Sequence, residues 1–368
     1  MFEIKNDNYS EVPKITVIGV GGGGNNALDR MINSNLLGVN YIAVNTDVHV
    51  LGACKANVKI QIGKKITKGY GAGADSEVGE MSALESEDEI REAIADEDMC
   101  VLTCGMGGGT GTGAIPVIAK CCKDAGILTV AVVTTPFSFE NTPRIKVAEN
   151  GIEKLKEYVD TLFIIPNDKL LELSEKRLLL EDAFEFADSV LKYTIESITN
   201  IVSHKGTVNL DFNDLKTTLT GKGVGHLGIG TVDAETPILE AVKQAINSPL
   251  LETSIEGAET ILINTSGKVD IISLYEAMNY VKEVAGDDVY IIWGTVKEDD
   301  VDNDKIIVTL IATGMEKKQA TNPLTAKTLM GDFRINESKR PIEEQEIGIA
   351  VPPFLRDSIS RHERKKSR

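Results

Sequence analysis

The sequence predicts an α/β fold in which a parallel-sheet, Rossmann-like domain is joined by a long central helix to a smaller α+β domain with a flexible C-terminal tail. The first half alternates short runs of branched apolar residues with helix-like segments, which is typical of a parallel sheet covered by helices. A long amphipathic segment and a second mixed unit follow. At 368 residues, 42% of them hydrophobic, the chain is long enough for about two domains of ordinary size.

Strands and helices alternate along the first half of the chain. Buried strands are predicted from the apolar runs at residues 14–20, 39–45, 99–103, 128–133 and 161–165. Helices are predicted between them, at residues 26–33, 83–95, 114–124 and 144–158. This order favours a parallel sheet, because consecutive parallel strands need a crossover connection.

A single long helix is predicted between the two halves. Apolar residues from Phe184 to Ile201 recur at steps of three and four, which predicts a helix from about residue 181 to 203. The second unit mixes helices with strands and is expected to form a sheet of three or four strands. Its predicted helices are 236–247 and 271–285, and its predicted strands are 260–264, 289–295 and 305–312.

The C-terminal part of the chain changes in composition. Residues 315–346 are mostly polar, which predicts a linker, and an apolar anchor at Val351–Leu355 precedes a basic run. Such an anchor suits docking into a partner's groove, with a merely disordered end as the alternative. The predicted parts are therefore a flexible N-terminus 1–11, a nucleotide-binding domain 12–180, the central helix 181–205, a C-terminal domain 206–315, a linker 316–346 and a partner-binding peptide 347–368.

Composition excludes several classes of protein. The net charge of −17 argues against general nucleic-acid binding, because a polyanion would be repelled over most of the surface. The five cysteines and four histidines show no zinc spacing, so they are expected to be structural, and no dedicated metal site is predicted. No apolar run approaches the roughly 18 residues of a membrane span, so a cytoplasmic location is expected.

Three glycine-rich segments point to an anion. In the richest, Gly105 to Gly113, every residue except Met106 is glycine or threonine, and it stands between a predicted strand and a predicted helix. The others are Gly19 to Gly24 and Gly69 to Ala74. A plain turn rarely needs more than one or two glycines. Bare N–H groups at a helix start suit phosphate oxygens, so these segments predict a phosphate-binding site.

The kind of nucleotide is open at this point. Gly19, Gly21 and Gly24 satisfy GxGxxG, and Asp47 lies near the distance at which a ribose-binding acid is expected, so an NAD-dependent oxidoreductase is one hypothesis. A P-loop enzyme is disfavoured because GxxxxGK[ST] is missing. Three glycine segments at the carboxyl ends of strands instead suit a mononucleotide with a long phosphate chain, assisted by Mg²⁺ held mainly through phosphates and water.

Asp211 and Asp214 form a candidate catalytic pair. They are three residues apart at the predicted start of a helix, so both project from one face. They could cap the helix, or they could orient a water molecule or a hydrated cation for attack on a phosphoryl group. Residue types alone leave both roles open.

These motifs together resemble the tubulin and FtsZ superfamily, most closely its bacterial FtsZ members, over roughly residues 12–315. The signature GGGTGTG stands at Gly107 to Gly113. The end of the chain, Ile349 to Arg356, looks like the short C-terminal peptide of FtsZ. The other matching segments, in order, are Gly21 to Asn26, Asn45 to Asp47, Gly71 to Ala74, Thr135 to Phe137 with Glu140 and Arg144, Ile165 to Asp168, and Asn209 to Asp214.

The resemblance implies a GTPase that assembles head to tail into protofilaments and forms the cytokinetic ring on the inner face of the membrane at mid-cell. It implies GTP and GDP as cofactors, a homopolymer as the first partner, and adaptors such as the actin-like tether FtsA bound through Val351–Arg356. Contact with the membrane would be only indirect. A tubulin-like shape or plasmid-partition GTPase is a further alternative, which the C-terminal peptide disfavours.

The resemblance also implies a role for each site residue. Asn209, Asp211 and Asp214 of a neighbouring subunit would complete the active site, and Asp188 would select guanine because a carboxylate accepts from both N1–H and the amino group. The phosphates would be held by Gly22, Gly23, Gly24, Asn25 and Asn26 together with Gly107, Gly108, Gly109, Thr110, Gly111 and Thr112. Ala72 and Gly73 would sense the γ-phosphate, Glu140 and Arg144 would contact the ribose side, and Phe184 and Asn167 would bind the base.

Overall fold

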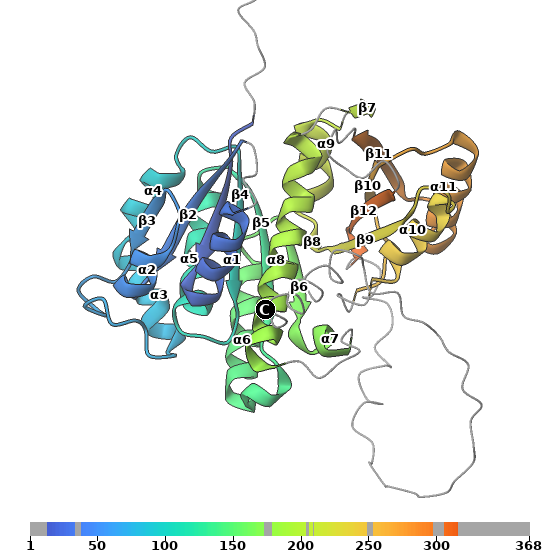
Figure 1. Cartoon of the computed structure of the whole chain (residues 1–368). Coiled ribbons are helices and arrows are strands. Elements are labelled where there is room, and N and C mark those ends of the chain that lie inside the picture. The colour runs from blue at the N-terminus through green and yellow to red at the C-terminus, as the bar shows by residue number, and fades with distance from the viewer. Residues whose placement is uncertain are drawn as a thin grey trace, which may run out of the picture.

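The structure of the chain, a computed structural model, describes residues 13–33, 38–172, 179–203, 206–208, 210–248, 253–296 and 305–315. Two sheets lie on either side of a long helix, α8 (Leu180–Ser203), in Figure 1. The predicted fold class is confirmed, since a parallel sheet with helices precedes α8 and a smaller mixed sheet follows it.

The first sheet is parallel throughout. Its order is β3-β2-β1-β4-β5-β6-β8, and each neighbouring pair runs in the same direction. The carboxyl ends of its strands therefore meet at one edge, where the segments after β1 and β4 lie side by side. The strands are β1 (Ile15–Val20), β2 (Val39–Asn45), β3 (Val58–Gln61), β4 (Met99–Gly105), β5 (Leu128–Thr135), β6 (Thr161–Pro166) and β8 (Gly223–Val224).

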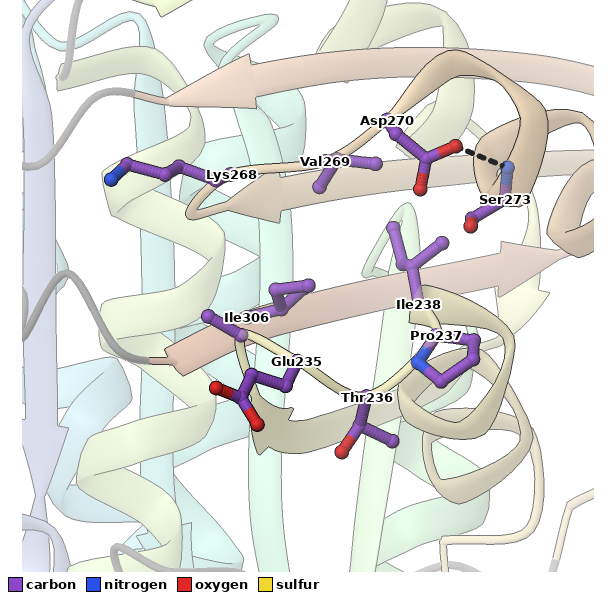
Figure 2. A pocket seen from close by; sticks show the side chains of 10 residues that line it. Glu235, Thr236, Pro237, Ile238, Lys268, Val269, Asp270, Ser273 and Ile306 are labelled. Atoms are coloured by element: carbon purple, nitrogen blue, oxygen red, sulfur yellow. Dashed lines mark hydrogen bonds between the residues drawn. The ribbon is translucent and has the colours of Figure 1, made fainter.

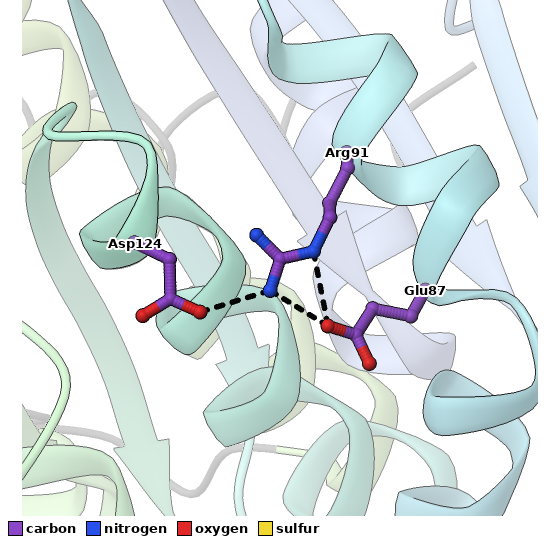
Figure 3. A network of polar contacts seen from close by, with 3 residues as sticks. All are labelled: Glu87, Arg91 and Asp124. Atoms are coloured by element: carbon purple, nitrogen blue, oxygen red, sulfur yellow. Dashed lines mark hydrogen bonds and ion pairs between the residues drawn. The ribbon is translucent and has the colours of Figure 1, made fainter.

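Helices cover both faces of this sheet. Alternate strand residues pack against α1 and α8 on one face, and the others pack against α4, α5 and α6 on the opposite face. Arg91 links α4 to α5 through an ion pair with Asp124 and also pairs with Glu87 on its own helix (Figure 3). The helices are α1 (Gly21–Ile32), α2 (Val48–Ala53), α3 (Ser76–Glu85), α4 (Glu87–Ile94), α5 (Thr110–Asp124), the short 3₁₀ helix η1 (Ser138–Glu140), α6 (Thr142–Lys156) and α7 (Asn167–Glu172).

The second sheet has the order β7-β11-β10-β12-β9. One face shares a hydrophobic core with α8 and α9 through Leu227, Leu262 and Ile311, and the other packs on α10 and α11. Between α8 and this sheet the chain passes through α9, which packs on the core of the first domain through Leu215 and Leu219. The elements are β7 (Gly206–Val208), α9 (Phe212–Leu219), β9 (His226–Asp233), α10 (Ile238–Ile246), β10 (Thr260–Ser266), α11 (Ile271–Ala285), β11 (Tyr290–Val296) and β12 (Lys305–Thr313).

The expected three- or four-stranded second sheet is wrong, because five strands pair in it. The prediction missed the short strand β7 and also β9, in which Gly228 and Gly230 interrupt the apolar pattern. A Cβ at either glycine would collide with the carbonyl oxygens of Ala245 and Ala241 on α10, so these glycines allow the helix to approach the sheet closely. The residue types of β9 are therefore determined by its packing against α10, and the strand lacks the alternation of apolar and polar side chains from which a strand is predicted.

The predicted helix at 83–95 is also wrong, since the chain bends at Ser86 between α3 and α4. The helices predicted from residues 26 and 114 begin earlier, at Gly21 and Thr110, so glycines thought to lie in loops form first helical turns. β8 comes from the predicted C-terminal domain but pairs with β6 in the first sheet. The predicted domain boundaries stay predictions, and the predicted N-terminus, linker and C-terminal peptide lie outside the described residues.

All five cysteines are buried and free, as the sequence predicts. Among the described residues, no helix combines the length and the apolar character that a membrane crossing requires. Over the same ranges, no group of three or more His, Cys, Asp or Glu side chains is placed to hold a metal ion.

Candidate nucleotide-binding site

Two glycine segments touch at the carboxyl edge of the first sheet. A Cβ on Gly21 would lie 2.8 Å from the backbone nitrogen of Gly111, and one on Gly23 would lie 3.2 Å from that of Gly105. Gly21 also has a φ of +71°, a conformation that favours glycine. The N-termini of α1 and α5 therefore meet without side chains between them.

The third glycine segment closes on the same place. A Cβ on Gly109 would lie 2.8 Å from the backbone nitrogen of Asp75 and 3.0 Å from Cβ of Ala72. The carbonyl of Gly109 also packs against Gly79 on α3. The three segments that the sequence singled out are thus brought together, as their positions after strands predict.

Three glycines in these segments face open space. A Cβ built on Gly22, Gly73 or Gly108 would meet no atom within 4 Å. We call these three residues the glycine cradle. Because the protein itself does not require glycine there for space, the absence of side chains suits the close approach of a ligand.

The helix termini at the cradle have no side-chain caps. Neither α1 nor α5 has a capping hydrogen bond or an acidic residue in its first turn. By contrast, α2, α3, α6, α9 and α11 each begin with an Asp or Asn whose side chain accepts from the first turn. Two uncapped positive helix ends at one place form a site for an anion such as phosphate.

Asn25 and Thr112 hold the shape of this site. Asn25 is buried, donates to the Gly19 carbonyl at 2.8 Å and accepts from Nδ2 of Asn45 at 2.7 Å. The Thr112 hydroxyl accepts from the Gly107 N–H at 2.8 Å, and that of Thr110 lies 2.6 Å from the Thr46 hydroxyl. The side chains of these predicted phosphate ligands bond within the protein, which leaves backbone groups as the simplest contacts for an anion.

Replacing Gly108 with alanine is expected to weaken nucleotide binding without unfolding the protein. The added methyl group would enter open space in the cradle and obstruct the ligand there. The affinity for nucleotide should therefore fall by about ten-fold or more. Isothermal titration with GDP and thermal unfolding without nucleotide measure the two effects. Gly109→Ala is the matched control, because its methyl group meets Asp75 and should lower the unfolding temperature itself. Unchanged GDP affinity in Gly108→Ala would show that the phosphates lie elsewhere.

Aromatic residues extend the site beyond the cradle. A Cβ on Gly107 would contact Pro136, whose neighbour Phe137 is fully buried and packs edge-on against Phe184 with ring centroids 5.3 Å apart. Phe139 stacks on Phe137, with ring centroids 5.0 Å apart. The Phe184 side chain, predicted to stack on the base, remains 39% exposed.

Asn167 and Asp188 are polar groups in largely buried surroundings. Asn167 is 4% exposed, and its Oδ1 atom has no hydrogen-bond partner within the described structure. Asp188 lies one turn after Phe184 on α8 with its side chain 15% exposed, and its Oδ2 is 3.5 Å from Nε of Arg30. We call Asn167, Phe184 and Asp188 the base cluster. A buried acceptor without a partner fits a ligand that donates hydrogen bonds.

Burial controls the charge of Asp188. Desolvation raises the pKa of this carboxyl to about 6, Arg30 acts against that rise, and Glu185 adds to it. At neutral pH the carboxylate is therefore mainly ionised, which is the form that accepts from two donors.

Glu140 and Arg144 are paired with each other. Their side chains form an ion pair at 3.0 Å, and Glu140 also accepts from the Phe137 N–H at 2.9 Å. Glu140 is nearly buried at 8% exposure, whereas Arg144 is 47% exposed and its stem lies against Gly107. Glu140 thus orders the turn at Phe137, and Arg144 is the member of the pair that faces solvent.

Asp211 and Asp214 form a capping box at the start of α9. Oδ1 of Asp211 accepts from the Asp214 N–H at 2.9 Å, and Oδ2 of Asp214 accepts from the Asp211 N–H at 3.0 Å. The capping role considered from the sequence is therefore present. Capping uses one oxygen of each carboxylate, so it does not exclude the other role considered from the sequence, which is to orient a water molecule or a hydrated cation. The third predicted member, Asn209, lies outside the described residues.

The carboxylate pair lies at the opposite end of α8 from the base cluster. From Asp188, α8 continues to Ser203, about 22 Å at the rise of an α-helix, before the chain reaches α9. Figure 1 shows α9 at one end of α8 and α7, which begins with Asn167, at the other. One molecule cannot bring the two groups together without a large rearrangement.

Asp47, the ribose-binding acid of the oxidoreductase hypothesis, caps α2. Its carboxylate accepts from the N–H groups of His49 and Val50 at 2.8 and 3.3 Å. Sequence reasoning missed Arg30, because nothing in the linear pattern indicates that the last turn of α1 reaches Asp188.

A cavity of about 120 Å³ in the second domain, between Glu235 and Asp270, is separate from the cradle and the base cluster (Figure 2).

The chain is similar to known proteins in sequence and in structure. The model of the Tubulin/FtsZ family, GTPase domain, matches residues 14–175, and that of the FtsZ family, C-terminal domain, matches residues 223–316. An empty FtsZ dimer from M. jannaschii is 42% identical with a TM-score of 0.77, covering 83% of this chain and 89% of that one. The predicted resemblance to FtsZ is thus confirmed, and the bacterial origin stays a prediction.

More distant structures share the fold. CetZ1 from Haloferax volcanii, a GDP-bound monomer, is 22% identical with a TM-score of 0.72, covering 83% of this chain and 95% of that one. CetZ2 from the same organism, a GTPγS-bound protofilament, is 18% identical with the same TM-score, covering 83% of this chain and 94% of that one.

Proposed function

Since the chain belongs to the tubulin/FtsZ family and carries the FtsZ C-terminal domain, we propose that it hydrolyses GTP at the contact between subunits of a head-to-tail filament. The observation that carries this proposal is the separation of two half-sites. The cradle and base cluster lie at one end of α8, and the Asp211–Asp214 pair lies at the other. A neighbour stacked along this axis would supply the missing half, and such a contact repeats without closing.

Apolar side chains are exposed at both ends of this axis. Near the cradle, Tyr70 is 83% and Phe139 is 56% exposed. At the other end, Ile271 and Ile272 are 82% and 70% exposed. Both isoleucines follow β10 along the chain. The last residue of β10 pairs with the end of β11, and that end of β11 pairs with β7, which comes shortly before Asp211. The two isoleucines are therefore on the side of the molecule that carries Asp211. Exposed apolar groups at both ends support burial between stacked subunits. The M. jannaschii relative is described as a dimer.

The residues present fit a guanine nucleotide. Backbone N–H groups at the starts of α1 and α5 would hold the phosphates, and the base cluster would accept from the guanine donors. Asp211 and Asp214 of the neighbour would orient the attacking water or attract a hydrated cation, while the positive helix ends stabilise charge on the transferred phosphoryl group. Mg²⁺ would be held mainly through the phosphates and water.

The direct test combines light scattering with phosphate release in GTP, in GDP and without nucleotide. Assembly with GTP, accompanied by phosphate release that rises more than linearly with protein concentration, is the expected result. Turnover per subunit that does not depend on concentration would contradict catalysis between subunits. Binding of NAD in preference to GDP would favour the oxidoreductase hypothesis, whose expected ribose-binding acid, Asp47, caps α2.

In the cell, this activity suits a cytoplasmic division ring that recruits other division proteins. The apolar and basic residues of Val351–Arg356, which lie outside the described residues, would bind adaptors of the FtsA type and so connect filaments to the membrane indirectly. A shape or partition GTPase sharing the fold is the alternative. It would not need this peptide.

Deleting residues 347–368 is expected to spare GTP-driven assembly and abolish recruitment to the membrane. The peptide follows a polar tether and is separate in sequence from every proposed nucleotide and interface residue. Light scattering of the purified variant and fluorescence imaging of a tagged chain in cells measure the two effects. Loss of assembly would instead assign the peptide a role within the filament.

A further inference from the structure

Arg30 connects the helix of the cradle with the helix of the base cluster. It lies in the last turn of α1, and its Nη1 donates to Oε1 of Glu185 at 2.8 Å. Its Nε lies 3.5 Å from Oδ2 of Asp188. Glu185 and Asp188 are neighbours on the surface of α8, so one guanidinium group pairs with both carboxylates across the packed helices.

We propose that Arg30 is a positioning residue for guanine recognition, which through its pair with Asp188 keeps that carboxylate charged and in place for the base. This inference rests on the guanine-nucleotide function proposed above. It goes further by assigning base selectivity to a residue on a second helix, outside the base cluster itself.

The charge of Asp188 depends on its surroundings. The side chain is only 15% exposed, and this burial raises its pKa to about 6 even though Arg30 acts to lower it. Removing Arg30 would raise that pKa further, toward the pH at which the protein works. A protonated carboxyl would present a donor to guanine, whose N1–H and amino group are both donors.

The charged groups around Asp188 act in opposite directions. Arg30 on α1 favours the ionised form, and Glu185, one turn earlier on α8, disfavours it. Strand β5, which packs beside α8, consists of uncharged residues. On α7, Asp168 is engaged by the backbone N–H of Ser138 at 2.9 Å. Burial is thus the largest influence on the pKa of Asp188, and among the charged groups Arg30 and Glu185 act on it in opposite directions.

The experiment measures GDP affinity of the full chain between pH 5 and pH 8.5, for the native protein and Arg30→Met, Arg30→Lys and Glu185→Gln. Native affinity should be nearly constant above pH 7 and fall as the pH drops through about 6. Arg30→Met should bind about ten-fold more weakly at pH 7, and this deficit should shrink as the pH rises because Asp188 ionises again. Arg30→Lys should restore most of the affinity.

Glu185→Gln provides a control of opposite sign. It breaks the other half of the Arg30 bridge but removes a negative charge, so the fall in affinity should move to lower pH. If the loss of GDP affinity in Arg30→Met is the same at every pH and Arg30→Lys does not restore the affinity, Arg30 has only a structural role in holding α1 against α8. That result would overturn the proposal. So would native affinity in Arg30→Met.

A failure of the proposed guanine-nucleotide function would give a different result. A native protein that binds GDP no better than ADP or NAD would refute the guanine assignment before any variant is considered. Should Arg30→Met fail to fold, Arg30→Gln takes its place, because it also removes the positive charge but keeps a side chain that can donate to Glu185. A pH profile of Arg30→Gln that matches the native one would overturn the proposal.

Discussion

Replacing Asp214 with asparagine should remove most GTP turnover while leaving GTP binding and assembly intact. Asparagine keeps an oxygen that can accept from the Asp211 N–H, so the capping box survives, but it lacks the charge needed to polarise water. A loss of about a hundred-fold or more in phosphate release is expected. Asp211→Asn should behave in the same way, since asparagine caps helices as well as aspartate does.

Asparagine and alanine variants separate the two roles of this pair. Asp214→Ala loses the charge and also the cap, which should lower stability by about 1 kcal/mol more than Asp214→Asn does. Asp88→Asn is a matched control, because it removes one exposed first-turn carboxylate from α4 without touching either half-site. Normal turnover in Asp214→Asn would leave the pair with capping alone.

Replacing Asp188 with asparagine should abolish selectivity for guanine. The amide supplies one acceptor where guanine offers two donors, and its NH₂ group meets a donor. We expect GDP affinity to fall by about a hundred-fold, with little preference over ADP remaining. Equilibrium titration with both nucleotides measures the change.

The same substitution should not destabilise the protein without nucleotide. Burial raises the pKa of Asp188 from 3.8 to about 6, so the ionised group opposes folding as the pH rises through that window. Removing the charge relieves this cost at neutral pH. Thermal unfolding at pH 7 should therefore give a similar or higher midpoint, whereas a markedly lower midpoint with unchanged GDP affinity would assign Asp188 to stability instead.

Local sequence patterns were sufficient for five of the seven strands of the first sheet, but not for β3 and β8, and they gave the position of the cradle. Branched apolar runs locate the main strands because each is buried on both faces, and the glycines that follow β1 and β4 mark where two helix starts meet. The same patterns placed those glycines in loops. In the structure Gly21 to Gly24 form the first turn of α1, and Gly111 and Gly113 lie in the first turn of α5, whereas Gly107 to Gly109 remain in the connection before it. The uncapped helix ends are therefore the source of the expected phosphate binding.

Features that depend on contacts distant in sequence could not be predicted in this way. The glycines of β9 are set by the close approach of α10, and the pairing of Arg30 with Asp188 is set by the packing of α1 on α8. The three-residue spacing of Asp211 and Asp214 predicts capping and catalysis equally well. Only their distance from the base cluster, along the length of α8, argues for a neighbour as the second half of the site.

A mixing experiment tests this central claim most directly. Asp214→Asn retains the nucleotide half-site, and Asp188→Asn retains the carboxylate half-site, so each alone should release little phosphate from GTP. An equimolar mixture should contain contacts in which both halves are intact, and its phosphate release should clearly exceed the sum of the two variants measured separately. A mixture that releases no more phosphate than that sum, although light scattering shows that the variants assemble together, would contradict an active site shared between subunits.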